Sequence, residues 1–169
     1  MKNHKILPIN KAMFQKIIFI FIFILFFVIN GFSQSQEDKI FKIGIDYFNA
    51  HKYQFAKRYL DRYIFLFPEG KNSIKCYEIL IKISLINKNY LKAIKYLNTV
   101  IKLFPSEINI PSYYNKIADV YFQTGKYEKS LQYYNYVIIK FPNTPEAEYA
   151  QFKIDQISLL TSSINNEDD

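Results

Sequence analysis

The sequence predicts an all-α fold, a short α-solenoid of three helix-hairpin repeats followed by a C-terminal capping helix. Two observations predict it. A pattern closed by Phe-Pro recurs every 37 residues, at Phe67-Pro68, Phe104-Pro105 and Phe141-Pro142, and a fixed period of that length is typical of repeat architectures. The composition agrees, because 50% of the residues are hydrophobic and only 4 are glycine, which suits a folded, helix-rich chain.

Residues 1–33 have the pattern of a secretory signal peptide. Lysines precede an unbroken apolar run from Ile17 to Ile29, and Asn-Gly-Phe-Ser follows it. The run is shorter than the roughly 18–20 residues that span a bilayer, but its strong hydrophobicity keeps an uncleaved anchor as the alternative. We therefore expect an exported protein, periplasmic or otherwise extracytoplasmic, that associates with a membrane only if this segment is retained.

The charge of the chain does not indicate a nucleic-acid partner. The formal net charge is +7, but four of the 22 basic residues and none of the 15 acidic residues precede Gln34. The rest of the chain is thus close to balanced, whereas nucleic-acid-binding domains carry a marked basic excess.

The second half of each repeat predicts an amphipathic helix. In the third repeat, spacings of one, three and four residues place the apolar side chains on one helical face. Proline disfavours a helical conformation at the residue before it, so each helix should end at or just before Phe-Pro. The apolar residues of this helix are Leu131, Tyr133, Tyr134, Val137, Ile138 and Phe141.

The first half of each repeat predicts a second helix, because its apolar residues also follow i, i+3, i+4 and i+7. Ser73 is placed to cap this helix in the second repeat, and Pro111 suits the first turn of the third. Links of three or four polar residues, such as "NKN" and "TGK", then make each pair an antiparallel hairpin. The expected repeats are residues 37–72, 73–109 and 110–143.

Residues 144–161 predict one further helix without a partner, as in the capping helix of a solenoid. Thr144 can cap it, Pro145 suits its first position, and Glu146 and Glu148 favour its amino terminus. Residues 162–169 are polar and acidic, and we expect them to form a disordered tail.

These marks resemble the tetratricopeptide repeat (TPR). Gly44 and Ala118 match its small residue in the first helix, although Ile81 departs from the pattern. Small residues are needed where two helices cross closely. The remaining matches are the turn aromatics Tyr53, Tyr90 and Tyr127, the second-helix small residues Ala56, Ala93 and Ser130, and the closing prolines Pro68, Pro105 and Pro142.

The loops after the closing prolines are about three residues longer than in the usual repeat of 34. In this they resemble the lengthened repeats of bacterial cell-envelope TPR proteins, namely the Tol–Pal coordinator and the barrel-assembly lipoprotein. The chain lacks the coiled coil of the former and the lipid-bearing Cys of the latter. The resemblance implies an exported scaffold that binds an envelope protein or peptide segment, but not the specific role of either relative.

The sequence does not predict an enzyme, and it indicates no cofactor or metal. His51 is the one histidine after the export segment, and its position at a hairpin turn favours a solvent-exposed residue over a ligand or base. Cys76 is the single cysteine, which excludes an intramolecular disulfide, and we expect a buried, inert thiol.

The resemblance places the binding surface on the concave side, lined by the first helix of each repeat. An apolar row flanked by lysines would suit a segment of another protein; the alternative is that the row only fills gaps between helices. A different function also stays open, a membrane-anchored structural subunit that assembles through its convex faces, and self-association is a further alternative. The candidate groove residues are Phe41, Ile45, Phe48, Glu78, Lys82, Leu85, Lys116, Asp119 and Phe122.

Overall fold

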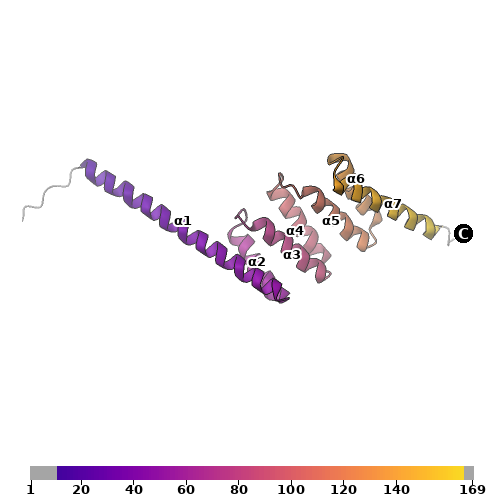
Figure 1. Cartoon of the computed structure of the whole chain (residues 1–169), viewed down its shortest axis with the longest axis horizontal. Helices are drawn as coiled ribbons and strands as arrows, with labels where there is room; N and C mark the ends of the chain where they lie inside the picture. Colours follow the sequence, from indigo (N-terminus) through magenta and orange to yellow (C-terminus); the bar gives the residue numbers. More distant parts are fainter. Residues whose placement is uncertain (1–10, 166–169) are drawn as a thin grey trace, which may run out of the picture.

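The computed structural model describes residues 11–165, and this part of the chain is helical with short connections (Figure 1). Its helices are α1 (Lys11–Asn49), α2 (Tyr53–Leu66), α3 (Ser73–Ile86), α4 (Tyr90–Leu103), α5 (Ile110–Gln123), α6 (Tyr127–Lys140) and α7 (Pro145–Asn165).

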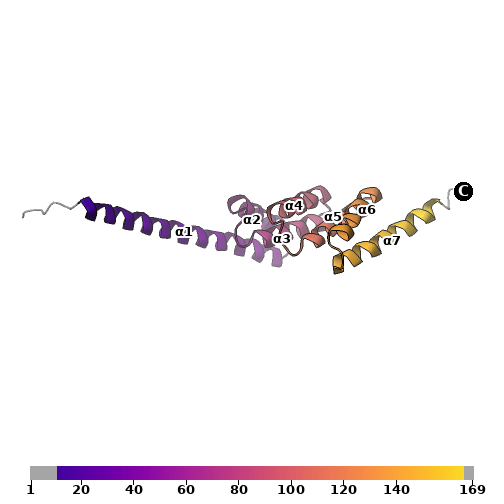
Figure 2. The ribbon, with the colours of Figure 1, turned by 90° about the horizontal axis from the view of Figure 1, so that it is seen from above.

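The helices pack in consecutive pairs, α1 with α2, α3 with α4 and α5 with α6, and α7 packs on α6 and α5. Figure 2 shows two layers, with α2, α4 and α6 in one and α3, α5 and α7 in the other, together with the carboxyl-terminal part of α1. The predicted α-solenoid of three hairpins with a terminal helix is thus confirmed.

The hairpins end where the Phe-Pro pairs predict. Phe67, Phe104 and Phe141 are the C-cap residues of α2, α4 and α6, and each N–H donates to the carbonyl four residues earlier at 2.8–2.9 Å. The turns inside the hairpins also repeat, because His51, Lys88 and Gly125 each have a positive φ, between 53° and 71°. This left-handed residue reverses the chain after the first helix of each pair.

Two of the three predicted helix starts are confirmed. Pro111 lies in the first turn of α5, and Thr144 Oγ1 accepts a hydrogen bond from the N–H of Ala147 at 3.2 Å. The prediction that Ser73 caps α3 is wrong, because Asn72 is the N-cap residue and its side chain makes no capping bond. Ser73 instead donates its hydroxyl to the carbonyl of Phe67 at 2.6 Å, which fastens the connecting loop to the end of α2.

The small residues lie at close helix crossings. Ala56, Ala93 and Ser130 are fully buried in the second helices. A Cβ added to Gly44 would lie 2.7 Å from Cδ2 of Leu60, so α1 and α2 approach more closely there than a larger residue allows. Ile81, which departs from the repeat pattern, is nevertheless buried.

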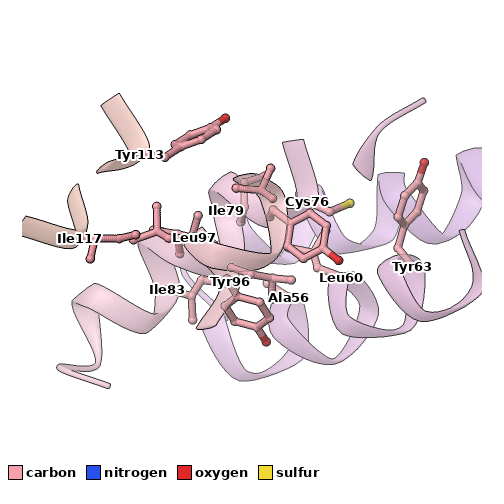
Figure 3. Close-up of a cluster of buried hydrophobic side chains, with 14 of the residues drawn as sticks. Ala56, Leu60, Tyr63, Cys76, Ile79, Ile83, Tyr96, Leu97, Tyr113 and Ile117 are labelled. Carbon is pink, nitrogen blue, oxygen red and sulfur yellow. The ribbon is translucent and has the colours of Figure 1, made fainter. Parts of the chain in front are cut away.

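The main core runs through the hairpins without a break. In Figure 3, buried side chains from α2, α3, α4 and α5 converge, among them Leu60, Ile79, Leu97 and Ile117. The Cys76 thiol lies in this core, fully buried, and burial raises its pKa to about 12. It is therefore a thiol rather than a reactive thiolate at neutral pH.

Both terminal helices are longer than their repeats require. α1 is one continuous helix from Lys11 to Asn49, and it includes much of the segment that the sequence assigns to a signal peptide. Glu37 is buried in this helix, whereas the described side chains before it are exposed. α7 continues to Asn165, four residues beyond the expected limit, because neither Gly nor Pro stops it; the rest of the expected tail, 166–169, lies outside the described residues. Among the residues described, no helix meets the length and hydrophobicity that crossing a membrane requires.

Candidate protein-binding face

We call the surface of α1, α3, α5 and α7 that faces away from the second helices the first-helix face. The sequence predicts its apolar row, Phe48, Leu85 and Phe122, and the structure leaves each of these side chains half-buried. The rings of Phe48 and Phe122 pack 5.8 and 5.7 Å from those of the turn aromatics Tyr53 and Tyr127. The row therefore fills space within each hairpin and also keeps a solvent-exposed edge.

The row continues towards the amino-terminal end of the face through Phe41 and Ile45, which are also half-buried and packed on the core. Phe41 meets the edge of the Tyr63 ring, with the ring centroids 5.9 Å apart. The sequence places Phe41 away from the second helix, whereas this contact joins it to α2.

Two polar members of the candidate groove, Glu78 and Lys116, bond to other residues of the protein. Glu78 pairs with Lys75 at 3.5 Å and accepts the hydroxyl of Tyr113 at 3.3 Å. Lys116 donates to Ser112 Oγ at 2.6 Å, and its burial lowers its pKa, although Glu78 and Asp119 oppose that effect.

Lys82 is different, because its side chain is exposed and no ion pair is formed with it in residues 11–165. It is thus the candidate groove residue best placed to meet a charged group of a partner.

Asp119 joins three helices. Its Oδ1 accepts the hydroxyl of Tyr134 on α6 at 2.5 Å and that of Tyr149 on α7 at 2.8 Å. Burial raises the pKa of both tyrosines, and hydrogen bonding to this carboxylate adds to the effect. The first role of Asp119 is therefore to hold α7 against α5 and α6.

Similar bonds join the earlier helices. Tyr63 donates to Glu37, Tyr96 donates to Asp61 at 2.5 Å, and Tyr113 donates to Glu78, which lies on a different hairpin. Buried tyrosines thus supply both apolar packing and a hydroxyl that meets a carboxylate from another helix.

A cleft of about 290 Å³ lies between α5 and α7. Asn115 is buried here, and its Nδ2 donates to the carbonyl of Glu146 at 2.8 Å. Its Oδ1 is buried and accepts no hydrogen bond from the described residues. Lys116, Asp119 and Tyr149 also line the cleft.

The sequence reasoning missed the contribution of α7 to this face. Tyr149, Phe152, Leu159 and Leu160 leave between 41% and 71% of their side chains exposed. These four residues lie one 37-residue period after four residues of α5, so extending the repeat pattern past the third hairpin would have identified them. The α5 residues are Ser112, Asn115, Phe122 and Gln123. α7 thus extends the first-helix face by one helix.

The described residues show no arrangement for metal binding, since they contain no group of three or more His, Cys, Asp or Glu residues placed to hold an ion. His51 is exposed at its turn and shares a hydrogen bond of 3.0 Å with Tyr53.

Comparisons with known proteins agree with the repeat architecture. Residues 111–138, within the third hairpin, match the tetratricopeptide repeat family. Among solved structures, the crystal structure of MamA superposes with a TM-score of 0.51 at 19% identity, over 78% of each chain. That likeness shows the fold. No curated protein matches the chain.

Proposed function

We propose that this protein is an exported, non-catalytic TPR scaffold of the cell envelope, which holds a segment of another protein on its first-helix face. The observation that carries the proposal is the composition of that face. Exposed apolar side chains on α7, Phe152 and Leu159, continue the half-buried row of Phe48, Leu85 and Phe122, and Lys82 lies exposed on the intervening α3.

Energetic arguments support binding of protein rather than of a small molecule. Exposed aromatic and aliphatic anchors beside charged groups are the features that dominate protein–protein recognition. The rigid stack of hairpins presents them in a fixed arrangement, which lowers the entropic cost of binding. The envelope location rests on the signal-peptide pattern of residues 1–33 and on the lengthened loops.

A variant confined to exposed positions tests the proposal. Lys82→Glu with Phe152→Ser reverses one charge and removes one apolar anchor, and neither side chain is needed for the core. The matched control, Lys95→Glu with Phe65→Ser, makes the same changes on α4 and α2, where Phe65 is 82% exposed. Leu85 and Phe122 are poorer choices because they pack on the core.

Each form is tagged, crosslinked in its own cells and isolated from the envelope fraction, and its co-isolated proteins are quantified by mass spectrometry. We expect the first variant to lose a reproducible partner by about tenfold or more, as the loss of a binding anchor of 1.4 kcal/mol or more implies. The control should retain it. Equal recovery with both variants would refute the proposed face, and recovery in the cytosolic fraction alone would refute the location.

A further inference from the structure

A second cavity, of about 700 Å³, opens between the second and third hairpins at the end that carries their turns. It lies apart from the first-helix face, between the α3–α4 turn and the α5–α6 turn. Lys88 and Lys126 come from those two turns, and Lys129 comes from the first turn of α6. Apolar side chains of α4 and α5 form the rest of the wall.

The charge of this cavity is wholly positive. Its lining contains three lysines and no carboxylate. In residues 11–165 none of the three forms an ion pair, and the one recorded contact of an ammonium group is Lys129 Nζ, 5.7 Å from the centre of the Tyr121 ring. The nearest acid in sequence, Glu128, lines a different cavity, to which Lys126 and Lys129 also contribute.

The backbone adds to the positive potential. α4 begins at this cavity, at Tyr90, and the residue before the start of α6, Lys126, also lines it. The N-cap residue of α6 is Lys126, and its side chain makes no capping bond to the first N–H groups of that helix. A helix amino terminus carries a partial positive charge that favours an anion.

The preceding junction of the repeat shows that this charge is not a requirement of the fold. One period earlier, the positions of Lys88, Lys126 and Lys129 hold His51, Asn89 and Lys92. His51 adopts the same left-handed turn as Lys88, with φ of 57° against 53°. Asn89 has nearly the same backbone angles as Lys126, and it caps α4 by accepting from the N–H of Lys92. Of the two described junctions between hairpins, only the one between the second and third hairpins therefore brings three lysines together.

The size and walls of the cavity indicate what fits there. A volume of about 700 Å³ is in the range of sites that hold several side chains rather than one inorganic anion. Leu91 stands at the cavity with 83% of its side chain exposed, and Ile94 and Tyr121 are half-buried beside it. An occupant would thus carry carboxylates for the lysines and an apolar side chain for this wall.

We propose that this cavity binds an acidic segment of a partner protein, with its carboxylates on Lys88, Lys126 and Lys129 and one apolar side chain against Leu91. Charge-assisted bonds from ammonium groups to carboxylates give such a site its specificity, and burial of the apolar side chain adds affinity. The inference does not depend on the first-helix face.

The test replaces two lysines of this cavity with the residues that stand at the equivalent positions between the first and second hairpins. Lys88→His with Lys126→Asn installs residues that the fold already accepts at the equivalent positions. The control, Lys95→Gln with Lys102→Gln, removes two exposed lysines of α4 outside the cavity. The probe is a fluorescein-labelled 12-residue peptide of Glu and Asp with one Leu and one Phe, and its partner probe has Gln and Asn in place of the acids.

Binding is measured by fluorescence anisotropy at pH 7.5 and 150 mM salt, where histidine is mostly neutral. The wild type should bind the acidic peptide about tenfold more tightly than the amide peptide, the exchanged variant should lose about tenfold, and the control should change less than about twofold. Leu91→Ser should weaken binding severalfold without lowering the melting temperature.

Several outcomes would overturn the proposal. Equal affinity of wild type and exchanged variant would do so, as would equal affinity for the two peptides. Full competition by millimolar phosphate, with no effect of Leu91→Ser, would assign the cavity to a small anion, and binding to vesicles of anionic lipid in place of the peptide would assign it to a membrane. Misfolding is not expected to confuse the result, because Lys126→Asn adds a cap to α6 and should raise the melting temperature.

Discussion

Tyr134→Phe gives the sharpest test of how the terminal helix is held on the solenoid. Oδ1 of Asp119 accepts the hydroxyls of Tyr134 and Tyr149 at 2.5 and 2.8 Å. The two tyrosines differ in burial, because Tyr134 is fully buried whereas 41% of Tyr149 is exposed. Water can therefore replace the hydroxyl of Tyr149 but not that of Tyr134.

This difference sets the expected magnitudes. A hydrogen bond to a charged group contributes about 1.5–3 kcal/mol to stability. Phenylalanine preserves the packing of the ring, and Asp119 keeps its bond to Tyr149, so Tyr134→Phe should lower the free energy of unfolding by about 1.5 kcal/mol, the lower end of that range. Tyr149→Phe should cost less than about 0.5 kcal/mol, because solvent takes over the lost bond.

The assay is urea unfolding at pH 7, followed by circular dichroism, for the wild type and both single variants. Asp119→Asn alone and in combination with Tyr134→Phe completes a double-mutant cycle, which should show a coupling of about 1 kcal/mol between the two residues. An equal cost for Tyr134→Phe and Tyr149→Phe, or a coupling near zero, would refute the reasoning from burial.

Two further predictions concern the core. Burial raises the pKa of Tyr63, Tyr96 and Tyr134 above 10, and the nearby carboxylates add to the effect; the folded state then keeps protons that the unfolded chain loses. The free energy of unfolding should stay constant up to about pH 10 and fall above it by about 1.4 kcal/mol per pH unit for each such tyrosine. Urea midpoints that do not change from pH 9 to pH 11 would contradict this. Ala93→Trp should overpack the buried crossing of α3 and α4 and cost about 1–3 kcal/mol. Lys95→Trp, exposed on the same helix, should be nearly neutral, and comparable melting temperatures for the two would contradict the register.

The sequence predicts the helices well because their signals are local. The Phe-Pro pairs and the apolar stripes lie within one helix or turn, and each second helix ends at the residue before the phenylalanine. Thr144 and Pro111 act within their own first turns as well. Ser73 shows where local signals fail. Its hydroxyl donates to the carbonyl of Phe67, six residues earlier, because the fold of the loop brings the two groups together.

The face and the cavity depend on contacts between helices, so much less of them could be predicted. Tyr96 and Asp61 are 35 residues apart in sequence, and no local pattern pairs them. Asn115 precedes the groove residue Asp119 by about one helical turn, yet it is buried and its side-chain amide bonds to Glu146 of α7. In the second cavity, Lys88 is separated from Lys126 and Lys129 by the whole length of two helices, although comparing successive periods reveals that Lys88 and Lys126 replace His51 and Asn89.

Site-specific photo-crosslinking in the native cells shows directly whether the first-helix face contacts a partner protein. A photoreactive amino acid is placed at Lys82 on α3 and, as the control, at Arg62 on α2, both of which are exposed. We expect Lys82 to crosslink to a defined envelope protein and Arg62 not to do so. Crosslinking of that protein from Arg62 and not from Lys82 would contradict it.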